Sequence, residues 1–277
     1  MKTTTHASAP QPTVEDPTGR VFCLSIVVPC YNEERTVAQV VQGLTALDMG
    51  AQFEIVAVDD GSSDATAEIL DGIHDQNLVV VHHEVNQGKG AAVRTGLARA
   101  TGTHFLIFDA DTEYDINDIP RMVAPILTGR AEVVYGNRMS GSGTAHPSLV
   151  HLIGNRVMTL CANVLFQSAI SDLHTCLKLL PLGMLNSFQL EETGFGLDTE
   201  ITAEMLRAGF RPFEVHIGYV GRSKEDGKKI KSSDAVRCIY VLCKVRLRGV
   251  TSFGKRNQAL APRTYAAAAV LRPAAAV

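Results

Sequence analysis

The sequence contains no tryptophan, no strong excess of either charge and no closely spaced pair of cysteines. A formal net charge of −3 over 277 residues argues against nucleic-acid binding by the whole chain, which would require a strongly basic balance. The six cysteines lie mostly in apolar stretches, with no C-x-x-C pair and no Cys/His set at zinc spacing. We therefore expect reduced, packed thiols and a cytoplasmic location.

Long apolar runs are also missing. Because no stretch of about 18 apolar residues is present, the sequence predicts no transmembrane helix of the usual length. Residues 1–20 lack the apolar region of a signal peptide, and their proline, threonine and serine content predicts a disordered tail. We expect one folded domain over residues 21–231, followed by an amphipathic helix and an alanine-rich tail over 232–277.

Short, β-branched apolar runs alternate with helical patterns through the first half of the chain. The runs are LSIVVP (24–29), FEIVAVDD (53–60), LVVVHH (78–83), HFLIFDAD (104–111) and AEVVYG (131–136). Continuous apolar runs are typical of strands buried on both faces of a parallel sheet. Residues 33–47 carry an apolar stripe at helical spacing, with Asn32 as a candidate N-cap. The pattern predicts a Rossmann-like α/β fold, an open, mostly parallel sheet flanked by helices, with ligands at the carboxyl ends of the strands.

The second half of the chain has longer helical patterns. We expect helices over 148–168, 198–208 and 234–248, a mixed segment over 171–181 and a strand over 210–219. The last helix is apolar through its middle and basic near its end. Basic amphipathic helices can lie in a membrane interface, which would give a peripheral membrane contact. In the alternative interpretation, this helix and helix 148–168 simply pack on the sheet.

Polar clusters follow four of the predicted strands. In chain order they are PCYNEE (29–34), DDGSSD (59–64), NQGKG (86–90) and DADTEYD (109–115). Since the carboxyl ends of parallel strands share one edge of a sheet, these clusters predict a pocket rich in acceptor groups. The plainer alternative is that they are ordinary loop residues.

The cluster DADTEYD places carboxylates on alternate residues directly after an apolar run. Asp109, Asp111 and Glu113 would then share one face, where a hard divalent cation would relieve their repulsion. Oxygen ligands favour Mg²⁺ or Mn²⁺ over Zn²⁺. Read alone, the cluster is equally well explained as an acidic turn, with Asp111 and Asp115 as turn and cap residues.

The other clusters are similarly ambiguous. Asp60 could accept N–H groups from a nucleobase or start a turn. The stretch NQGKG is not a phosphate-binding P-loop, but Lys89 opens a helix whose N-terminus favours an anion. Alternatively, Lys89 is a solvated surface charge. The pair His82–His83 is better explained as polar surface at a strand end than as a ligand set.

Eight blocks together resemble a family 2 glycosyltransferase of the GT-A fold, with a closer likeness to polyprenyl (dolichyl) phosphate sugar synthases. The blocks are VVPCYNEE, VDDGSSDAT, NQGKGAAVRTG, FDADTEYDINDIP, YGNRMSG, SDLHTCLKLL, GFGLDTEI and GRSKEDGKKI, within about residues 22–248. The resemblance implies that residues 21–231 are a GT-A catalytic domain. It departs from the family on the acceptor side, where FGLDTEIT replaces FGFEPEIT.

The resemblance also implies roles for individual residues. Those that match nucleotide-binding positions are Pro29, Tyr31, Glu33, Asp60 and Lys89, and those that match the metal-binding positions are Asp109, Asp111 and Glu113. Those that match acceptor-side or diphosphate-side positions are Arg138, Arg156, Asp172, Thr175, Arg222, Lys228 and Lys229. The catalytic set implied by the family is Asp109, Asp111, Arg138 and Asp172.

The expected reaction is an inverting transfer of a mannose- or glucose-like sugar from a GDP- or UDP-linked donor to a polyprenyl phosphate, with Mg²⁺ or Mn²⁺. An ionised phosphate acceptor needs no general base. A soluble hydroxyl acceptor, the main alternative, does need one, and Asp172, Asp198 and Glu200 are the candidates. A third alternative is a non-catalytic nucleotide-binding scaffold. A dehydrogenase is disfavoured because no G-x-G-x-x-G follows the first strand.

Overall fold

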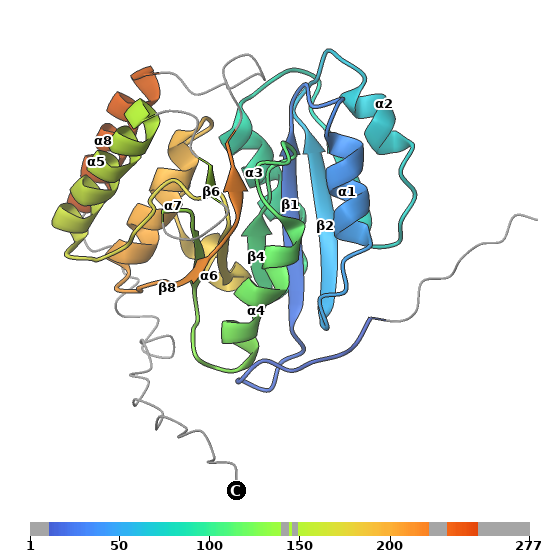
Figure 1. Ribbon diagram of the computed structural model, residues 1–277, viewed down its shortest axis with the longest axis horizontal. Helices are drawn as coiled ribbons and strands as arrows, with labels where there is room; N and C mark the ends of the chain where they lie inside the picture. Colours follow the sequence, from blue (N-terminus) through green and yellow to red (C-terminus); the bar gives the residue numbers. More distant parts are fainter. Residues whose placement is uncertain (1–10, 140–143, 146–148, 222–231, 249–277) are drawn as a thin grey trace, which may run out of the picture.

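The computed structural model describes residues 11–139, 144–145, 149–221 and 232–248. These residues form a seven-stranded sheet flanked by helices (Figure 1), which confirms the predicted α/β open sheet. Its strand order is β3-β2-β1-β4-β7-β5-β8. The strands are β1 (Cys23–Cys30), β2 (Gln52–Asp59), β3 (Leu78–His82), β4 (His104–Ile107), β5 (Val134–Asn137), β7 (Lys178–Pro181) and β8 (Phe213–His216). A separate parallel pair joins β6 (Thr144–Ala145) to β9 (Tyr219–Val220).

The central strands are parallel and almost wholly buried, as their continuous apolar runs predict. Strand β1 pairs with β2 on one side and with β4 on the other, and all four residues of β4 are buried. The predicted positions of β1, β2, β3 and β5 agree with the structure to within a few residues. Strand β4 is shorter than predicted, because it ends at Ile107 and leaves residues 108–111 in the loop beyond it.

Helices cover both faces of the sheet and extend past one end of it. They are α1 (Val37–Thr45), α2 (Thr66–Asp71), α3 (Lys89–Arg99), α4 (Ile119–Leu127), α5 (Leu149–Phe166), α6 (Leu182–Ser187), α7 (Gly196–Arg207), α8 (Ser232–Leu247) and the 3₁₀ turn η1 (Ile116–Asp118). In Figure 1, α1 and α4 lie in front of the sheet and α3 lies behind it. Helices α5, α7 and α8 contact one another beside the β7–β5–β8 end.

Strand β7 differs from the sequence prediction. The segment 171–181 was expected to be mixed, but its last four residues form a strand inserted between β4 and β5 and antiparallel to both. The sheet is therefore mixed, although mostly parallel. The insertion brings residues 172–176, which precede β7, to the carboxyl end of β4.

The predicted disordered tail is also partly wrong. Residues 11–20 lie against the start of the sheet, where Gln11 Oε1 accepts a hydrogen bond from the Phe53 amide at 2.8 Å. Val14 O accepts one from the Phe22 amide at 2.7 Å. The side chain of Asp16 is buried and closes the following turn by accepting from the Thr18 amide at 2.8 Å. Order within the described residues thus begins before residue 21.

No helix in the described ranges combines the length and the apolar character needed to cross a membrane. All six cysteines are free thiols, as their spacing predicted.

Candidate functional site

The loops that follow β1 and β2 are hydrogen-bonded to each other. Pro29 belongs to β1, and the half-buried residues Tyr31 and Glu33 follow that strand. Asn32 was expected to cap a helix, but α1 begins only at Val37. Asn32 instead has a positive φ of 52°, and its side-chain oxygen accepts a hydrogen bond from the Ser63 amide at 2.8 Å. Pro29, Tyr31 and Glu33, three of the residues predicted to bind the nucleotide, therefore lie at one edge that hydrogen bonds hold in place.

Asp60 is buried and organises the loop that leads into α3. One carboxylate oxygen lies 2.7 Å from His83 Nδ1 and accepts from the Gln87 amide at 2.9 Å, and the other accepts from the Gly88 amide at 2.8 Å. His83 Nε2 lies 2.9 Å from Thr95 Oγ1. The interpretation of His83 as polar surface is therefore wrong, because its side chain is only 8% exposed. Recognition of a nucleobase by Asp60 stays a prediction.

The start of α3 packs closely against the loop before α7. A Cβ atom on Gly90 would lie 2.7 Å from Glu192 O and from Thr193 C, so only glycine fits at this position. The Ala91 amide donates to Thr193 O at 3.0 Å. These contacts fix the backbone that carries Lys89.

Two lysines and two aspartates form a compact cluster beside β4. Lys89 Nζ lies 2.7 and 2.9 Å from the two carboxylate oxygens of Asp109 and 3.8 Å from Asp198. Lys178, on β7, donates to Asp198 O at 2.9 Å and lies 3.4 Å from Asp198 Oδ1. Burial disfavours charge on Lys89, but the Asp109 carboxylate outweighs it and raises the pKa of Lys89 well above its usual value.

Burial also affects Lys178 and Asp198, with different net results. It lowers the pKa of Lys178, although Asp198 opposes the shift. Burial would raise the pKa of Asp198, but Lys178 and Lys89 outweigh it and lower that pKa. Sequence reasoning missed Lys178. The only signal was a single lysine inside an otherwise apolar stretch, CLKLLP.

The three carboxylates predicted to bind a metal do not converge. Asp111 Oδ1 accepts from the Glu113 amide at 3.2 Å, and Glu113 Oε2 accepts from the Tyr219 hydroxyl at 2.8 Å. Among the described residues, no group of three or more His, Cys, Asp or Glu side chains is arranged to hold a metal ion. Asp109 and Asp111 still suit Mg²⁺ or Mn²⁺, because such ions are commonly held by one or two carboxylates and the phosphates of a substrate.

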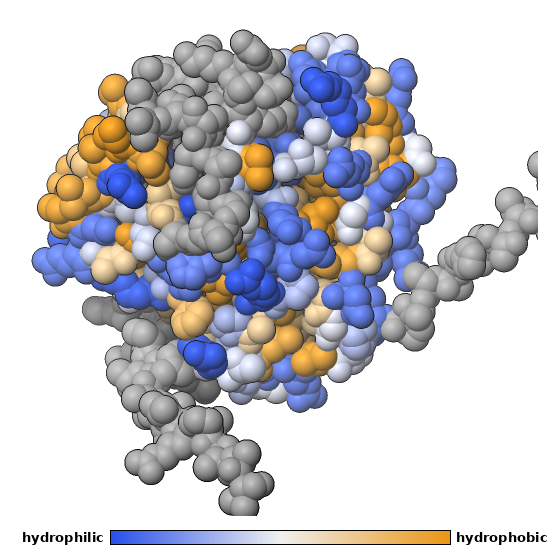
Figure 2. Space-filling view, in the orientation of Figure 1, coloured by the Kyte–Doolittle hydropathy of each residue, from blue (hydrophilic) through white to orange (hydrophobic). Residues whose placement is uncertain are grey.

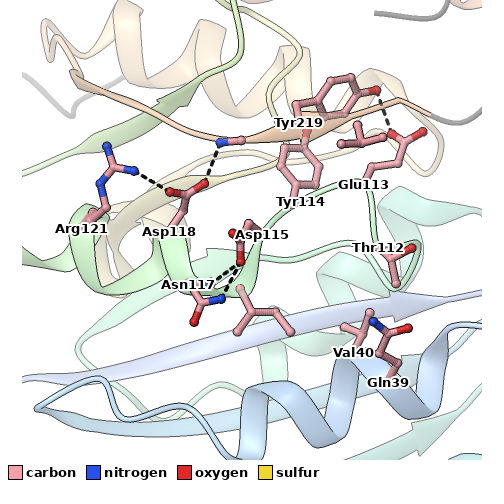
Figure 3. A pocket seen from close by; sticks show the side chains of 13 residues that line it. Gln39, Val40, Thr112, Glu113, Tyr114, Asp115, Asn117, Asp118, Arg121 and Tyr219 are labelled. Atoms are coloured by element: carbon pink, nitrogen blue, oxygen red, sulfur yellow. Dashed lines mark hydrogen bonds and ion pairs between the residues drawn. The ribbon is translucent and has the colours of Figure 1, made fainter. Parts of the chain in front are cut away.

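A hollow of about 660 Å³ lies beside this loop (Figure 3). It is framed by α1, residues 112–118 and β9. Asp118 accepts from the Gly218 amide at 2.7 Å and from Arg121 at 2.8 Å. Asp115 accepts from the Asn117 amide at 2.9 Å, so its predicted role as the start of the next helix is confirmed. The acidic side chains of the hollow thus have structural partners.

A buried ion pair joins Arg138, the residue directly after β5, to the segment before β7. Arg138 Nε and one terminal nitrogen donate to the two oxygens of Asp172 at 2.6 and 2.8 Å. Arg138 also donates to the Tyr114 hydroxyl at 3.2 Å, and its guanidinium lies 4.9 Å from the Tyr219 ring centroid. Burial would raise the pKa of Asp172, but the Arg138 charge outweighs it and lowers that pKa to about 2.

A chain of hydrogen bonds extends from this pair to α5 and α7. The side-chain nitrogen of Asn155 donates to Asp172 Oδ1 at 2.9 Å. The side-chain oxygen of Asn155 therefore faces His174, and it accepts a hydrogen bond from His174 Nδ1 at 3.0 Å. Burial and the nearby Lys178 charge lower the pKa of His174 to about 4, so the ring is neutral at pH 7. Its Nε2 is then free to accept from Thr199 Oγ1, 3.3 Å away.

The remaining acceptor-side residues are separated from one another. Arg156 is exposed on α5, whereas its neighbour Asn155 reaches the Asp172 carboxylate. Thr175 is fully buried, and its hydroxyl oxygen has no hydrogen-bond partner in the part of the chain that the structure describes. The predicted basic lid residues, Arg222, Lys228 and Lys229, lie outside the described residues.

Several relatives carry similar sequences. The chain is 29% identical over 197 residues to the low-salt glycan biosynthesis hexosyltransferase Agl6 of Haloferax volcanii, covering 69% of this chain and 46% of that protein. It is 35% identical over 144 residues to an undecaprenyl-phosphate 4-deoxy-4-formamido-L-arabinose transferase of Pseudomonas fluorescens, covering 49% and 42%. The chain thus spans less than half the length of these two relatives.

The fold has a close counterpart among solved structures. Glucosyl-3-phosphoglycerate synthase from Mycobacterium tuberculosis, in complex with Mn²⁺, UDP and phosphoglyceric acid, superposes with a TM-score of 0.63 and 20% identity, over 81% of this chain and 78% of that chain. The predicted GT-A fold is confirmed. The sequence model of glycosyl transferase family 2 matches residues 25–177, which is more than half of the chain. The chain therefore belongs to glycosyl transferase family 2.

Proposed function

We propose that this chain transfers a mannose- or glucose-like sugar, with inversion, from a GDP- or UDP-linked donor to a polyprenyl phosphate. Its family and fold support transfer from a nucleotide sugar. The similarity to the undecaprenyl-phosphate transferase of Pseudomonas fluorescens supports an isoprenoid phosphate acceptor. The Mycobacterium enzyme, whose complex contains phosphoglyceric acid, supports a soluble acceptor as the alternative.

On the donor side, Pro29, Tyr31, Glu33 and Asp60 would surround the nucleoside, and Lys89 would face the diphosphate. Asp109 and Asp111 are the residues that would hold Mg²⁺ or Mn²⁺. The ion would neutralise charge that develops on the leaving diphosphate. Glu113 is the proposed third ligand, and its Oε2 would have to exchange the Tyr219 hydroxyl, 2.8 Å away, for the ion. Arg222, Lys228 and Lys229 are proposed to add positive charge near the diphosphate.

The observation that carries the acceptor assignment is the state of the three candidate bases. Asp172 is locked to Arg138, and its pKa of about 2 makes it a weak base. The Asp198 carboxylate lies 3.4 Å from Lys178 Nζ, and Glu200 is fully buried, with one oxygen accepting from the Glu191 and Glu192 amides at 2.8 and 2.9 Å. A hydroxyl acceptor needs a base to remove its proton, whereas an ionised phosphate does not. These contacts favour the phosphate.

The proposed acceptor residues have distinct tasks. The Arg138–Asp172 pair would orient the side of the site where the acceptor phosphate enters, and the buried Thr175, in the same segment before β7, is proposed to line that side. Arg156 would meet the phosphate from the exposed face of α5. Because a lipid phosphate resides in a membrane, we also propose a peripheral contact at its cytoplasmic face.

The test combines labelled nucleotide sugars, Mg²⁺ or Mn²⁺ and a polyprenyl phosphate. We expect label from one GDP- or UDP-linked hexose to enter the organic-solvent phase. Asp111→Ala should lower this rate by about 100-fold or more, because the site then loses charge stabilisation of the leaving group. Arg121→Ala, on the outer side of the hollow, is the matched control and should retain activity.

Two outcomes would replace the proposal. If label moves only to a soluble hydroxyl compound and remains aqueous, the alternative acceptor is correct. If nucleotide sugar raises the melting temperature but neither transfer nor hydrolysis occurs with any acceptor, the chain is a non-catalytic nucleotide-binding scaffold.

A further inference from the structure

Lys89 occupies the carboxylate that a metal ion would require. Its ammonium nitrogen is 2.7 and 2.9 Å from the two oxygens of Asp109, and both side chains are only 19% exposed. We propose that Lys89 is an internal counter-ion that blocks Asp109 until a nucleotide diphosphate draws it away, so that metal and donor bind as one unit. This inference rests on the proposed function, because it concerns the same donor site.

The first argument is steric and electrostatic. A divalent ion bound to a carboxylate oxygen lies about 2.0–2.1 Å from it, in the space that the Lys89 ammonium now fills. Both cations cannot use Asp109 in this way, since they would also repel each other in a poorly solvated site. A metal ion arriving alone must therefore displace a nearly buried ion pair.

The second argument is charge balance. Lys89 and Lys178 carry two positive charges, and Asp109 and Asp198 carry two negative charges, so the cluster is neutral. If a metal takes Asp109, one carboxylate remains for two lysines. The Asp198 carboxylate is 3.8 Å from Lys89, but its other oxygen already lies 3.4 Å from Lys178. An additional anion is required, and a diphosphate supplies it.

The third argument concerns what can move. The backbone of Lys89 is fixed by the Asp60 contacts to Gln87 and Gly88 and by the close approach of Gly90 to Thr193. The long side chain is the adaptable part. Exchange of the ammonium from Asp109 to phosphate oxygens thus needs side-chain rotation and no rearrangement of α3.

The test measures metal and nucleotide binding separately. In wild-type protein without nucleotide, Mn²⁺ should bind weakly by electron paramagnetic resonance. Lys89→Met should lower the Kd for Mn²⁺ about tenfold, because Asp109 is then unoccupied. The same variant should raise the Kd for GDP or UDP about tenfold in EDTA, because a phosphate contact is lost. Arg94→Met removes an equal charge from the same helix and should change neither constant.

Opposite shifts in the two constants are the signature of a counter-ion, since general damage to the site would weaken both. The inference is overturned if Lys89→Met binds Mn²⁺ no more tightly than wild type while remaining folded by circular dichroism. It is also overturned if neither protein binds Mn²⁺ at millimolar concentration. If the opposite shifts occur but no sugar transfer is found, the counter-ion stands and the proposed function fails.

Discussion

At the scale of single residues, the Arg138–Asp172 pair shows that a variant of a buried charge can lose activity for a structural reason. Both side chains are almost inaccessible, at 11% and 1% exposure, and Arg138 donates two hydrogen bonds to Asp172. Removing one partner leaves the other charge buried and unpaired. Loss of activity in an Asp172 variant would therefore not identify a general base.

We predict that Asp172→Asn lowers the free energy of unfolding by about 3–5 kcal/mol, as expected for a broken buried ion pair. The double variant Arg138→Met, Asp172→Leu should recover most of that stability but not activity. Urea unfolding of the three proteins checks this. If the single variant unfolds at the wild-type denaturant concentration, the pair is not a structural constraint.

Two histidines with lowered pKa values predict how stability depends on pH. Burial lowers the pKa of His104 to about 4, and His174 has a similar value. Unfolding returns each to about 6.5, so between pH 6.5 and 4 the unfolded chain binds more protons. Stability should fall as pH falls through this window, by up to about 3 kcal/mol for each histidine.

The variant His104→Phe tests this dependence away from the proposed site. Phenylalanine can keep the stacking on Phe22, whose ring centroid lies 4.8 Å from that of His104, but it does not titrate. Urea unfolding from pH 7 to 4.5 should show a clearly shallower slope than wild type. Exposed His74 is the comparison, and His74→Phe should leave the slope as it is. An unchanged slope in His104→Phe would contradict the prediction.

Single residues also show what sequence reasoning could and could not reach. Asp60 was singled out because of its chemistry, but its partner His83 was not. The register that pairs Asp59 with His82 would have indicated the contact, and it is known only once β2 and β3 are aligned. Arg156 was singled out and Asn155 was not, because a helix pattern does not reveal that Asn155 contacts Asp172.

At the scale of elements, the parallel half of the sheet was predictable because local pattern determines it. Strands buried on both faces have continuous apolar runs, and β1 is an example. Strand β7 was not predicted, because its four residues follow a polar segment and their place between β4 and β5 depends on non-local pairing. Since β7 delivers Lys178 and the residues before it, the acceptor half was correspondingly harder to predict.

Two glycines in helices should respond oppositely to alanine. A Cβ atom on Gly154 of α5 meets no atom within 4 Å, so Gly154→Ala should stabilise by about 0.5–1 kcal/mol through helix propensity. Gly90→Ala should destabilise, because its Cβ would lie 2.7 Å from Glu192 O. It should also weaken nucleotide binding by displacing Lys89. Thermal unfolding and nucleotide titration check both variants, and equal effects would contradict the prediction.

At the scale of the whole molecule, large apolar side chains gather on the outer faces of α5 and α8. Figure 2 shows this apolar surface at its left edge, over these two helices. The exposed residues are Ile153, Val157, Leu160 and Val164 on α5 and Val236, Ile239, Tyr240 and Leu247 on α8. We call these eight residues the α5–α8 surface. A group of exposed apolar side chains on neighbouring helices predicts an interaction site.

Helix α5 connects this surface to the proposed acceptor site. Its inner side carries Asn155, which bonds Asp172, while Val157 and Leu160 point outward. A helix with side chains is about 10–12 Å across, so a bilayer touching the outer face would lie close to the acceptor side. Arg237 and Lys244 pair with Glu192 and Glu191, so apolar insertion is the main expected force.

We predict that Leu160→Glu combined with Val164→Glu lowers partitioning onto phospholipid vesicles about tenfold or more. Insertion of the two apolar side chains contributes several kcal/mol to the free energy of membrane binding. Insertion of carboxylates in their place is unfavourable. Val79→Glu, exposed on edge strand β3, is the matched control and should sediment with vesicles like wild type. Transfer to a short, water-soluble polyprenyl phosphate analogue should survive in both variants, since neither alters the catalytic side chains.

If vesicle binding is unchanged but light scattering shows a dimer becoming a monomer, a second copy of the chain covers the α5–α8 surface instead. Separating binding from catalysis in this way identifies the surface as the element that brings the site to the lipid.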